Sequence, residues 1–472
     1  MVVWQFVSCP TVRSVGLRNE RGLFSSAFFG RWHLNASAAS SATETQGMRR
    51  VVIAGGLGTL IEYYDYALYG CAATIIAPLF FPATDGAASL LAVLAVFAVS
   101  YVARPVGGVF FGWLGDRYGR RRALLATVVG IGVANAAMGV LPTYAMVGVV
   151  APTLLVVVRV AQGFFAGGEV GGAATMISEG APSGRKARYG AFVPMGINSG
   201  FALAAASVGA ATGVLTKAQL DSWGWRILFL LGLPLALLCY AARRALPDID
   251  ATIEDAGWRR IPLLSTVRDH PVALVQSIGL GVSVQGTAYF SLTFLSIYLV
   301  TYLHYPRSAV YWISAAVTLW AVALMPLAGR LADRVGTLQV ATIGLMGYAI
   351  LTYPCLLVMG VGHLGWATAA LVLICSNMAA LQVATYTITP PLFPRDVRYT
   401  ATALGTNLSS VLAGGTAPYV STWLVAWTGD LMSPYYFVAV TSIIGLLAVI
   451  SIGVRRRRAI DRQPVGRIAK PV

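Results

Sequence analysis

The stretch Gly112–Arg122, GWLGDRYGRRR, has a counterpart half a chain away at Gly329–Gly336, GRLADRVG. Both fit the frame G-x-L-x-D-R-x-G, in which glycines permit a sharp turn and the acid can face a helix N-terminus or an arginine. A basic, turn-rich loop would explain the arginines but not the doubling. The repeated frame therefore predicts a chain built from two similar halves.

Composition indicates what kind of halves these are. The 472-residue chain is 57% hydrophobic and 11% charged, with a mean hydropathy of +0.71. A soluble globular domain carries about 25% charged residues. Fifty glycines suit membrane helices, where small residues allow close packing. The sequence predicts an all-α membrane protein.

Apolar segments recur along the chain, each long enough to cross about 30 Å of hydrocarbon at 1.5 Å per residue. We number them spans 1 to 12, and they cover residues 50–80, 88–111, 123–141, 147–178, 189–212, 225–242, 271–301, 308–328, 337–358, 364–392, 399–425 and 434–454. Each copy of the loop frame follows the second span of a six-span half. We therefore expect twelve transmembrane helices in two six-helix pseudo-symmetric halves, 48–242 and 271–454, with a central loop at 243–270 and a basic tail at 455–472.

The net charge of +16 is distributed as a membrane protein requires. Loops after even-numbered spans are rich in arginine, whereas the opposite side offers only Lys217, Arg226 and Arg307. The positive-inside rule then places these loops and both termini in the cytoplasm. The basic balance indicates topology, and no nucleic-acid partner is expected.

Residues 1–47 lie outside the span pattern. They lack a continuous apolar segment, so they are not a secretory signal, although their arginines and serines resemble a transit peptide. Met48 begins the sequence MRR, which is a natural start with two positive charges before span 1. We favour a disordered or spurious extension and expect a chain that begins at Met48 to insert normally.

Motifs of enzymes and metalloproteins are missing from the sequence. Five cysteines and four histidines are scattered without ligand spacing, and neither a phosphate loop nor a nucleophile elbow is found. We expect no metal, no cofactor and no catalytic residues.

Longer stretches resemble one family. The loop frame is similar to the loop 2–3 signature of the major facilitator superfamily. Four stretches resemble the metabolite:H+ symporter family within it: GTLIEYYDYALYG at 58–70, VARPVGGVFFGWLGDRYGRRRALL at 102–125, RVAQGFFAGGEVGGAATMISEGAP at 159–182 and LFPRDVRYTATALGTNLSSVLAGGTAPYVSTWL at 392–424. The resemblance covers roughly residues 48–455.

The resemblance implies a secondary active transporter in the plasma (inner) membrane of a bacterium, acting as a monomer. It would take up a small organic acid or zwitterion with a proton, by alternating access. Family members carry dicarboxylates, oxo acids, shikimate-like acids or betaines. The tail RRRRAIDRQPVGRIAKPV lacks the heptads of the family's osmosensing betaine carriers, which disfavours betaine. Alternatives are a proton-driven exporter, a non-transporting sensor on the same fold and, more distantly, a membrane enzyme.

Five charged residues lie inside the hydrocarbon, away from the span ends, and all are in the first half: Glu62, Asp65, Arg104, Arg159 and Glu169. Each costs about 2.5–3.5 kcal/mol in hydrocarbon unless it is paired or faces water. Asp65 lies about 22 Å along span 1 at 1.5 Å per residue, and Arg159 reaches a similar depth in span 4. We predict that Asp65, Glu62 and Arg159 couple transport to protons through an Asp65–Arg159 pair. The alternative is a permanent structural ion pair.

A substrate pocket is expected beside these charges. Arg159, Gln162 and Glu169 share one helical stripe, and a guanidinium suits a substrate carboxylate. Arg104 is expected either to contact substrate or to pair with Glu169 or a helix-end carbonyl. The predicted pocket residues are Arg104, Gln162, Glu169, Asn198, Gln285, Tyr289, Gln382, Tyr386 and Asn407.

A cytoplasmic gate is expected around the two loop frames, because a rocking carrier needs contacts that close one side. Its predicted residues are Gly112, Asp116, Arg117, Gly119, Arg120, Glu179, Arg188, Asp333, Arg334 and Arg398.

Overall fold

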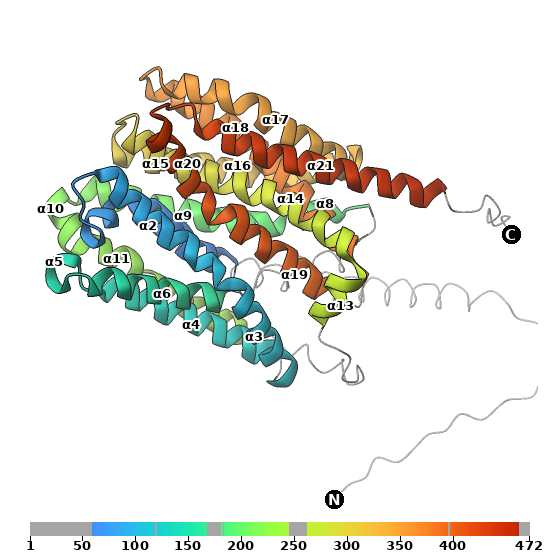
Figure 1. The fold of residues 1–472 in the computed structure, drawn as a ribbon, viewed down its shortest axis with the longest axis horizontal. Helices are drawn as coiled ribbons and strands as arrows, with labels where there is room; N and C mark the ends of the chain where they lie inside the picture. Colours follow the sequence, from blue (N-terminus) through green and yellow to red (C-terminus); the bar gives the residue numbers. More distant parts are fainter. Residues whose placement is uncertain are drawn as a thin grey trace, which may run out of the picture. The chain divides into compact units, whose positions relative to one another are not determined.

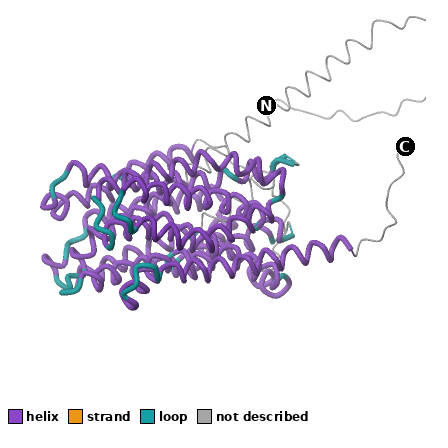
Figure 2. Tube along the Cα trace, turned by 90° about the horizontal axis from the view of Figure 1, so that it is seen from above, coloured by secondary structure: helices purple, strands orange, loops and turns teal. Residues whose placement is uncertain are grey.

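The computed structural model describes residues 59–118, 120–167, 181–182, 184–244, 262–394 and 397–461. Almost all of these residues are helical and none of them forms a strand. Figure 2 shows the described helices running alongside one another, with the described loops at their ends. The predicted all-α class is confirmed. The predicted extension at 1–47, most of the central loop and the end of the tail lie outside the described residues.

Every predicted span of the first half contains helix among its described residues. Span 1 is the helix at residues 59–80. Spans 2 to 6 overlap α2 (Gly86–Val102), α3 (Arg104–Tyr118), α4 (Arg120–Val140), α6 (Val150–Ala166), α8 (Lys186–Gly190), α9 (Phe192–Val214), α11 (Trp225–Leu230) and α12 (Gly232–Arg244). Between spans 5 and 6 lie α10 (Lys217–Gln219) and η1 (Leu220–Gly224). The short helix α5 (Tyr144–Val147) joins spans 3 and 4.

The second half follows the same plan. Helix α13 (Pro262–Asp269) precedes it. Spans 7 to 12 contain α14 (Pro271–Tyr289), η3 (Phe290–Phe294), α15 (Leu295–Thr301), α16 (Arg307–Val335), α17 (Thr337–Met359), α18 (Leu364–Ile388), η4 (Pro390–Leu392), α19 (Arg398–Ser409), η5 (Ser410–Gly414), α20 (Thr416–Thr428) and α21 (Pro434–Asp461).

Among the described residues, nine helices are long and apolar enough to cross a membrane. The remaining three predicted spans are helical too, and each has a visible reason for missing that standard. Span 1 carries Glu62 and Asp65, and its start lies outside the described residues. Span 4 is described only over Val150–Ala166, and span 11 is rich in threonine and serine.

Helix contacts repeat between the halves, as the doubled loop frame predicts. In the first half α2 packs on α6 and α4 packs on α12, which are spans 2 with 4 and 3 with 6. In the second half α16 packs on α18 and α17 packs on α21, which are spans 8 with 10 and 9 with 12. Between the halves, α9 packs on α16 and α20 packs on α2 (Figure 1). These two contacts, spans 5 with 8 and 11 with 2, are equivalent under a pseudo-two-fold axis.

Large apolar side chains remain exposed on the outer helix faces, for example Val133, Leu237 and Ile350. In water such a surface would be unfavourable, but it suits contact with lipid tails. Trp366 and Trp427 are exposed near span ends, where aromatic side chains favour the membrane interface.

Three glycines let spans 2 and 4 touch through their backbones. A Cβ added at Gly107, Gly163 or Gly167 would lie 1.7, 1.8 or 1.9 Å from a carbonyl oxygen of the facing span. No side chain fits at such a distance, so this crossing is fixed by glycine. The contact sets the spacing between Arg104 on span 2 and Arg159 on span 4.

We predict that Gly163→Ala lowers the melting temperature of the detergent-solubilised protein, because overpacking of this kind costs about 1–3 kcal/mol or more. Gly453→Ala is the control, since a Cβ there would meet nothing within 4 Å. Size-exclusion profiles recorded after heating measure both variants. Equal melting temperatures for the two variants would show that spans 2 and 4 can move apart without a loss of stability.

Candidate functional site

Span 1 supplies two buried acids to the interior of the first half. Glu62 and Asp65 are each 1% exposed. Their three-residue spacing puts them on one side of the helix. Each carboxylate meets a group from another span, and the two sets of partners differ.

Glu62 forms an ion pair with Arg104, and both side chains are buried. Arg104 is the first residue of α3, directly after the Ala103 break that separates α2 from α3. We expected a substrate, Glu169 or a helix-end carbonyl as its partner, whereas the ion pair that the structure describes is with a carboxylate of span 1. A contact with Glu169 stays a prediction. Glu169 lies outside the described residues. The buried pair satisfies much of the charge that either residue would otherwise carry alone in the membrane.

Tyrosine rings surround the Arg104 guanidinium. Its Cζ lies 4.6 Å from the ring centroid of Tyr66, 5.2 Å from that of Tyr101 and 5.9 Å from that of Tyr63. Aromatic faces attract cations at these distances. Arg104 is thus held by one carboxylate and three rings.

Asp65 and Arg159 are joined through Gln162 instead of pairing directly. Arg159 Nη1 donates to Gln162 Oε1 at 2.7 Å, and Gln162 Nε2 donates to Asp65 Oδ1 at 3.1 Å. The same Nε2 donates to Asn135 Oδ1 of α4 at 3.2 Å. The predicted direct Asp65–Arg159 pair is therefore wrong for this conformation, because the amide of Gln162 occupies the space between the two charges.

Arg159 rests on aromatic rings. Its Cζ lies 4.0 Å from the ring centroid of Tyr69 and 5.5 Å from that of Tyr66. Tyr66 therefore contacts both guanidinium groups and separates the Glu62–Arg104 pair from the Asp65–Gln162–Arg159 chain. The Nε and Nη2 atoms of Arg159 and the Oδ2 atom of Asp65 have no hydrogen-bond partner within the described protein.

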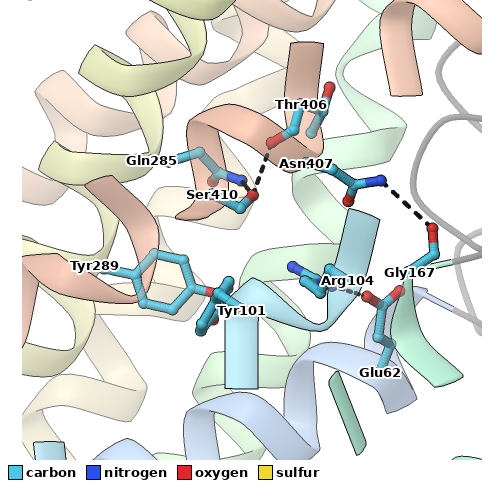
Figure 3. A network of polar contacts seen from close by, with 9 residues as sticks. All are labelled: Glu62, Tyr101, Arg104, Gly167, Gln285, Tyr289, Thr406, Asn407 and Ser410. Atoms are coloured by element: carbon cyan, nitrogen blue, oxygen red, sulfur yellow. Dashed lines mark hydrogen bonds and ion pairs between the residues drawn. The ribbon is translucent and has the colours of Figure 1, made fainter. Parts of the chain in front are cut away.

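The second half meets this site at Tyr289 of α14. Its hydroxyl accepts a hydrogen bond from the Tyr101 hydroxyl at 2.5 Å, and the two rings meet edge to face (Figure 3). Phe97 and Phe201 also pack against the Tyr289 ring. One continuous aromatic cluster thus spans both halves beside the two arginines.

Other predicted pocket residues also link helices by neutral hydrogen bonds. Asn198 of α9 donates to Gln382 of α18 at 2.6 Å, which crosses between the halves. Asn407 of α19 donates to the Gly167 carbonyl at 3.5 Å, which also crosses between them. Gln285 donates to Ser410 at 2.7 Å within the second half, and Figure 3 shows it facing η5 while Asn407 points to Gly167.

A polar pocket lies between α14, α18 and α19 in the second half. It is lined by Ser277, Gly281, Val284, Gln285, Thr385, Tyr386, Thr389, Pro390, Thr402 and Thr406. Gln285 and the half-buried Tyr386 are predicted pocket residues that line it. The hydroxyls of Ser277, Thr385 and Thr402 are buried without a protein partner, so this wall offers hydrogen bonds but no charge.

Comparison with known proteins places this geometry in a family. A model of sugar and other transporters matches residues 51–249, and a model of the major facilitator superfamily matches residues 277–471. A proline/betaine transporter of Salmonella typhimurium is 32% identical over 416 residues, covering 86% of this chain and 83% of that protein. The chain belongs to the major facilitator superfamily.

Further relatives agree with this assignment. An inner membrane metabolite transport protein of Escherichia coli is 33% identical over 397 residues, covering 81% of this chain and 89% of its own. The solved proton:xylose symporter of E. coli shares the fold at 15% identity, with a TM-score of 0.67 over 87% of this chain and 96% of that one. The predicted superfamily fold and a multi-pass membrane transporter, rather than an enzyme, are confirmed.

One side of this superfamily member carries the predicted gate residue Asp333. Its carboxylate accepts hydrogen bonds from the backbone N–H groups of Ala187 at 2.8 Å and Arg188 at 3.2 Å. These residues lie at the start of α8, directly before span 5, so an acid of the second half caps a helix of the first half. A Cβ at Gly329 would lie 2.8 Å from Arg188 Cα, which shows how closely the halves approach here.

The other predicted gate residues are less engaged. Arg117 is exposed over the rings of Trp113 and Tyr118, and Arg334 is exposed. Arg398 donates to the Phe393 carbonyl at 3.2 Å. Gly112 has open space beside its Cα. Gly119, Glu179 and the side chains of Asp116 and Arg120 lie outside what the structure describes.

Sequence reasoning missed Asn135 and the tyrosines. Tyr63, Tyr66 and Tyr69 recur at three-residue spacing beside the two acids, and this stripe was a readable signal. Asn135 had no such signal, since a single amide in span 3 does not show which helix it faces.

We predict that Glu62→Gln destabilises the transporter, because it leaves the Arg104 charge buried without its carboxylate. Removing one partner of a buried pair costs about 3–5 kcal/mol, whereas replacing both is often close to neutral. The double variant Glu62→Gln/Arg104→Gln should therefore recover part of the melting temperature lost in Glu62→Gln. If the double variant loses as much melting temperature as the two single variants lose together, the pair is not energetically coupled.

Proposed function

We propose that this transporter takes up a small organic acid or zwitterion together with a proton, by alternating access of its two halves. The observation that carries the proposal is the chain Asp65–Gln162–Arg159. It places a buried acid with one unpartnered oxygen next to a buried guanidinium with two unpartnered nitrogens. The acid is suited to carry the proton and the guanidinium to bind a carboxylate.

The aromatic cluster supports a substrate that combines a carboxylate with an apolar or cationic part. Tyr66, Tyr101 and Tyr289 lie where the halves meet, and aromatic faces suit alkyl and ammonium groups. The curated relatives include proline/betaine transporters and a metabolite transporter, so zwitterions and acids are both represented among them. The preference against betaine, based on the tail, stays a prediction.

The expected setting is the plasma membrane with both termini in the cytoplasm and one chain as the working unit. The arginine-rich loops support this orientation through the positive-inside rule. The pocket between α14, α18 and α19 then lies in the cytoplasmic half of the protein, because span 7 begins on that side and span 10 ends there.

We predict that Asp65→Asn abolishes accumulation driven by a pH gradient while exchange of preloaded solute continues, because the amide carries no titratable proton. Proteoliposomes with an alkaline interior and an acidic exterior measure uptake of proline, glycine betaine, 2-oxoglutarate and shikimate, with counterflow measured in parallel. Asp269→Asn, an exposed acid before span 7, is the control. Undiminished uphill uptake by Asp65→Asn would contradict the assignment.

Asp333 is the second part of the proposal, as a contact that closes the cytoplasmic side. It caps span 5 from the opposite half, and an acid at a helix N-terminus contributes on the order of 1 kcal/mol. A balanced two-state carrier shifts several-fold for a change of that size.

We predict that Asp333→Asn increases cytoplasmic opening and lowers turnover, with solute affinity within a few-fold of wild type. A cysteine at Thr406, which lines the pocket, reports opening through its labelling rate. The described native cysteines are buried, so they contribute little background. Asp430→Asn is the matched control, because Asp430 accepts from the Met432 N–H in a loop away from span 5. A large loss of binding with unchanged labelling would assign Asp333 to the substrate site.

A further inference from the structure

The amide of Gln162 is held at both ends. Its Oε1 accepts from Arg159, and its Nε2 donates to Asp65 and Asn135, so both kinds of group on the amide are used. Gln162 and Arg159 are each 0% exposed. No other residue joins the acid to the guanidinium in the part of the chain that the structure describes.

The charges at each end fix the direction of this amide. A guanidinium only donates hydrogen bonds, so it must face Oε1. An ionised carboxylate only accepts them, so it must face Nε2. The arrangement therefore matches an ionised Asp65, and a proton on Asp65 removes one of the two reasons for this orientation.

The net charge of Asp65 and Arg159 together explains why the amide of Gln162 between them matters for coupling. With Asp65 ionised and Arg159 charged, the Asp65–Gln162–Arg159 group has no net charge when no solute is bound. With a proton on Asp65 and a carboxylate at the unpartnered Nε and Nη2 of Arg159, it is neutral again. The two half-loaded states each carry a net charge in a low-dielectric interior, where an uncompensated charge is strongly disfavoured.

We propose that Gln162 is the positioning residue that couples protonation of Asp65 to carboxylate binding at Arg159. This inference rests on the proposed function. In the unprotonated state Gln162 holds Arg159 toward Asp65, which supplies the countercharge. The proton binds Asp65 at its unpartnered Oδ2, the hold on Gln162 weakens, and the carboxylate of the solute becomes the countercharge of Arg159.

A spacer suits this exchange better than direct contact. A direct Asp–Arg pair with two charge-assisted hydrogen bonds would have to break before each binding event. An amide between the two charges transmits their orientation while leaving one edge of Arg159 unpartnered for a ligand. Asn135 adds a fixed acceptor from α4, which keeps Nε2 in place.

The charged and titratable groups around Asp65 are few. Arg159 faces it from α6, and Tyr64 and Tyr66 lie near it on its own helix. Asn135 and Gln162 are neutral. Tyr66 stands between this group and the Glu62–Arg104 pair, which balances its own charge.

The test is the coupling of proton and solute flux in Gln162→Leu, which keeps the volume but removes the hydrogen bonds. Proteoliposomes receive whichever of proline, glycine betaine, 2-oxoglutarate and shikimate the wild type accumulates best. A pH difference of one unit supports up to about tenfold accumulation at one proton per solute. We expect the wild type to approach this ratio and Gln162→Leu to fall to about one, with counterflow retained and less dependent on pH.

Gln162→Glu supplies a rescue that a purely structural role would not produce. A protonated glutamate offers Arg159 an acceptor and Asp65 a donor, as the amide does, so coupled uptake should return at acidic pH and be lost near neutrality. Gln276→Leu is the matched control. Gln276 of α14 donates a hydrogen bond to Ser451, and both residues belong to the second half, whereas Asp65, Gln162 and Arg159 belong to the first.

The outcomes separate this inference from the proposed function. If both Gln162→Leu and Gln162→Glu keep the accumulation ratio and the pH profile of the wild type, the proposed role of Gln162 is wrong. Loss of coupling in Asp65→Asn would in that case still support symport. If Gln162→Leu does not fold, the pH-dependent rescue of Gln162→Glu decides alone. If the pH gradient drives no uptake of any tested solute by the wild type, the proposed function fails and this inference with it.

Discussion

The burial of Arg104 against Glu62 is the interaction on which the first half depends. A lone charge inside the hydrocarbon costs about 2.5–3.5 kcal/mol, so spans 1 and 2 must lie where the carboxylate reaches the guanidinium. The glycine contacts between spans 2 and 4 then place Arg159 at a fixed distance from that pair. The positions of both arginines follow from one ion pair and one close helix crossing.

The two arginines differ in how completely they are neutralised. Arg104 has a carboxylate and three tyrosine rings, which suits a structural role. Arg159 has the neutral amide of Gln162 and aromatic faces, so its charge is not fully matched by its contacts. The difference was hidden in the sequence, where both read as single arginines in apolar helices.

The fold could be predicted from the sequence because its signals are periodic or repeated. The loop frames at Gly112 and Gly329, the apolar spans and the arginine-rich loops each constrain topology without knowledge of contacts. The stripe of Arg159 and Gln162 on span 4 was likewise readable from spacing. Partner choice was not, because it depends on which helices become neighbours. Arg104 was assigned to a substrate, Glu169 or a carbonyl, and Asp65 to Arg159. Spacing alone does not give the rotation and depth of span 1, which bring Glu62 to Arg104 and Asp65 to Gln162.

Charge and motion are separated in this transporter. The charged groups at the centre, Glu62 with Arg104 and Asp65 with Arg159, all belong to the first half, so rocking the halves does not require either group to be pulled apart. Among the described residues, the side-chain hydrogen bonds that cross between the halves beside these groups are neutral: Tyr101 with Tyr289, Asn198 with Gln382, and Asn407 with a carbonyl. A neutral hydrogen bond contributes about 0.5–1.5 kcal/mol net, whereas breaking a buried ion pair costs about 3–5 kcal/mol. Asp333 is a charged group that does cross in the described part of the chain, and it lies after the end of span 8, where water can replace the helix N-terminus as its partner. The halves can therefore separate by breaking weak hydrogen bonds, and in the mechanism that we propose the proton and the solute bind to a charged cluster that moves as one piece.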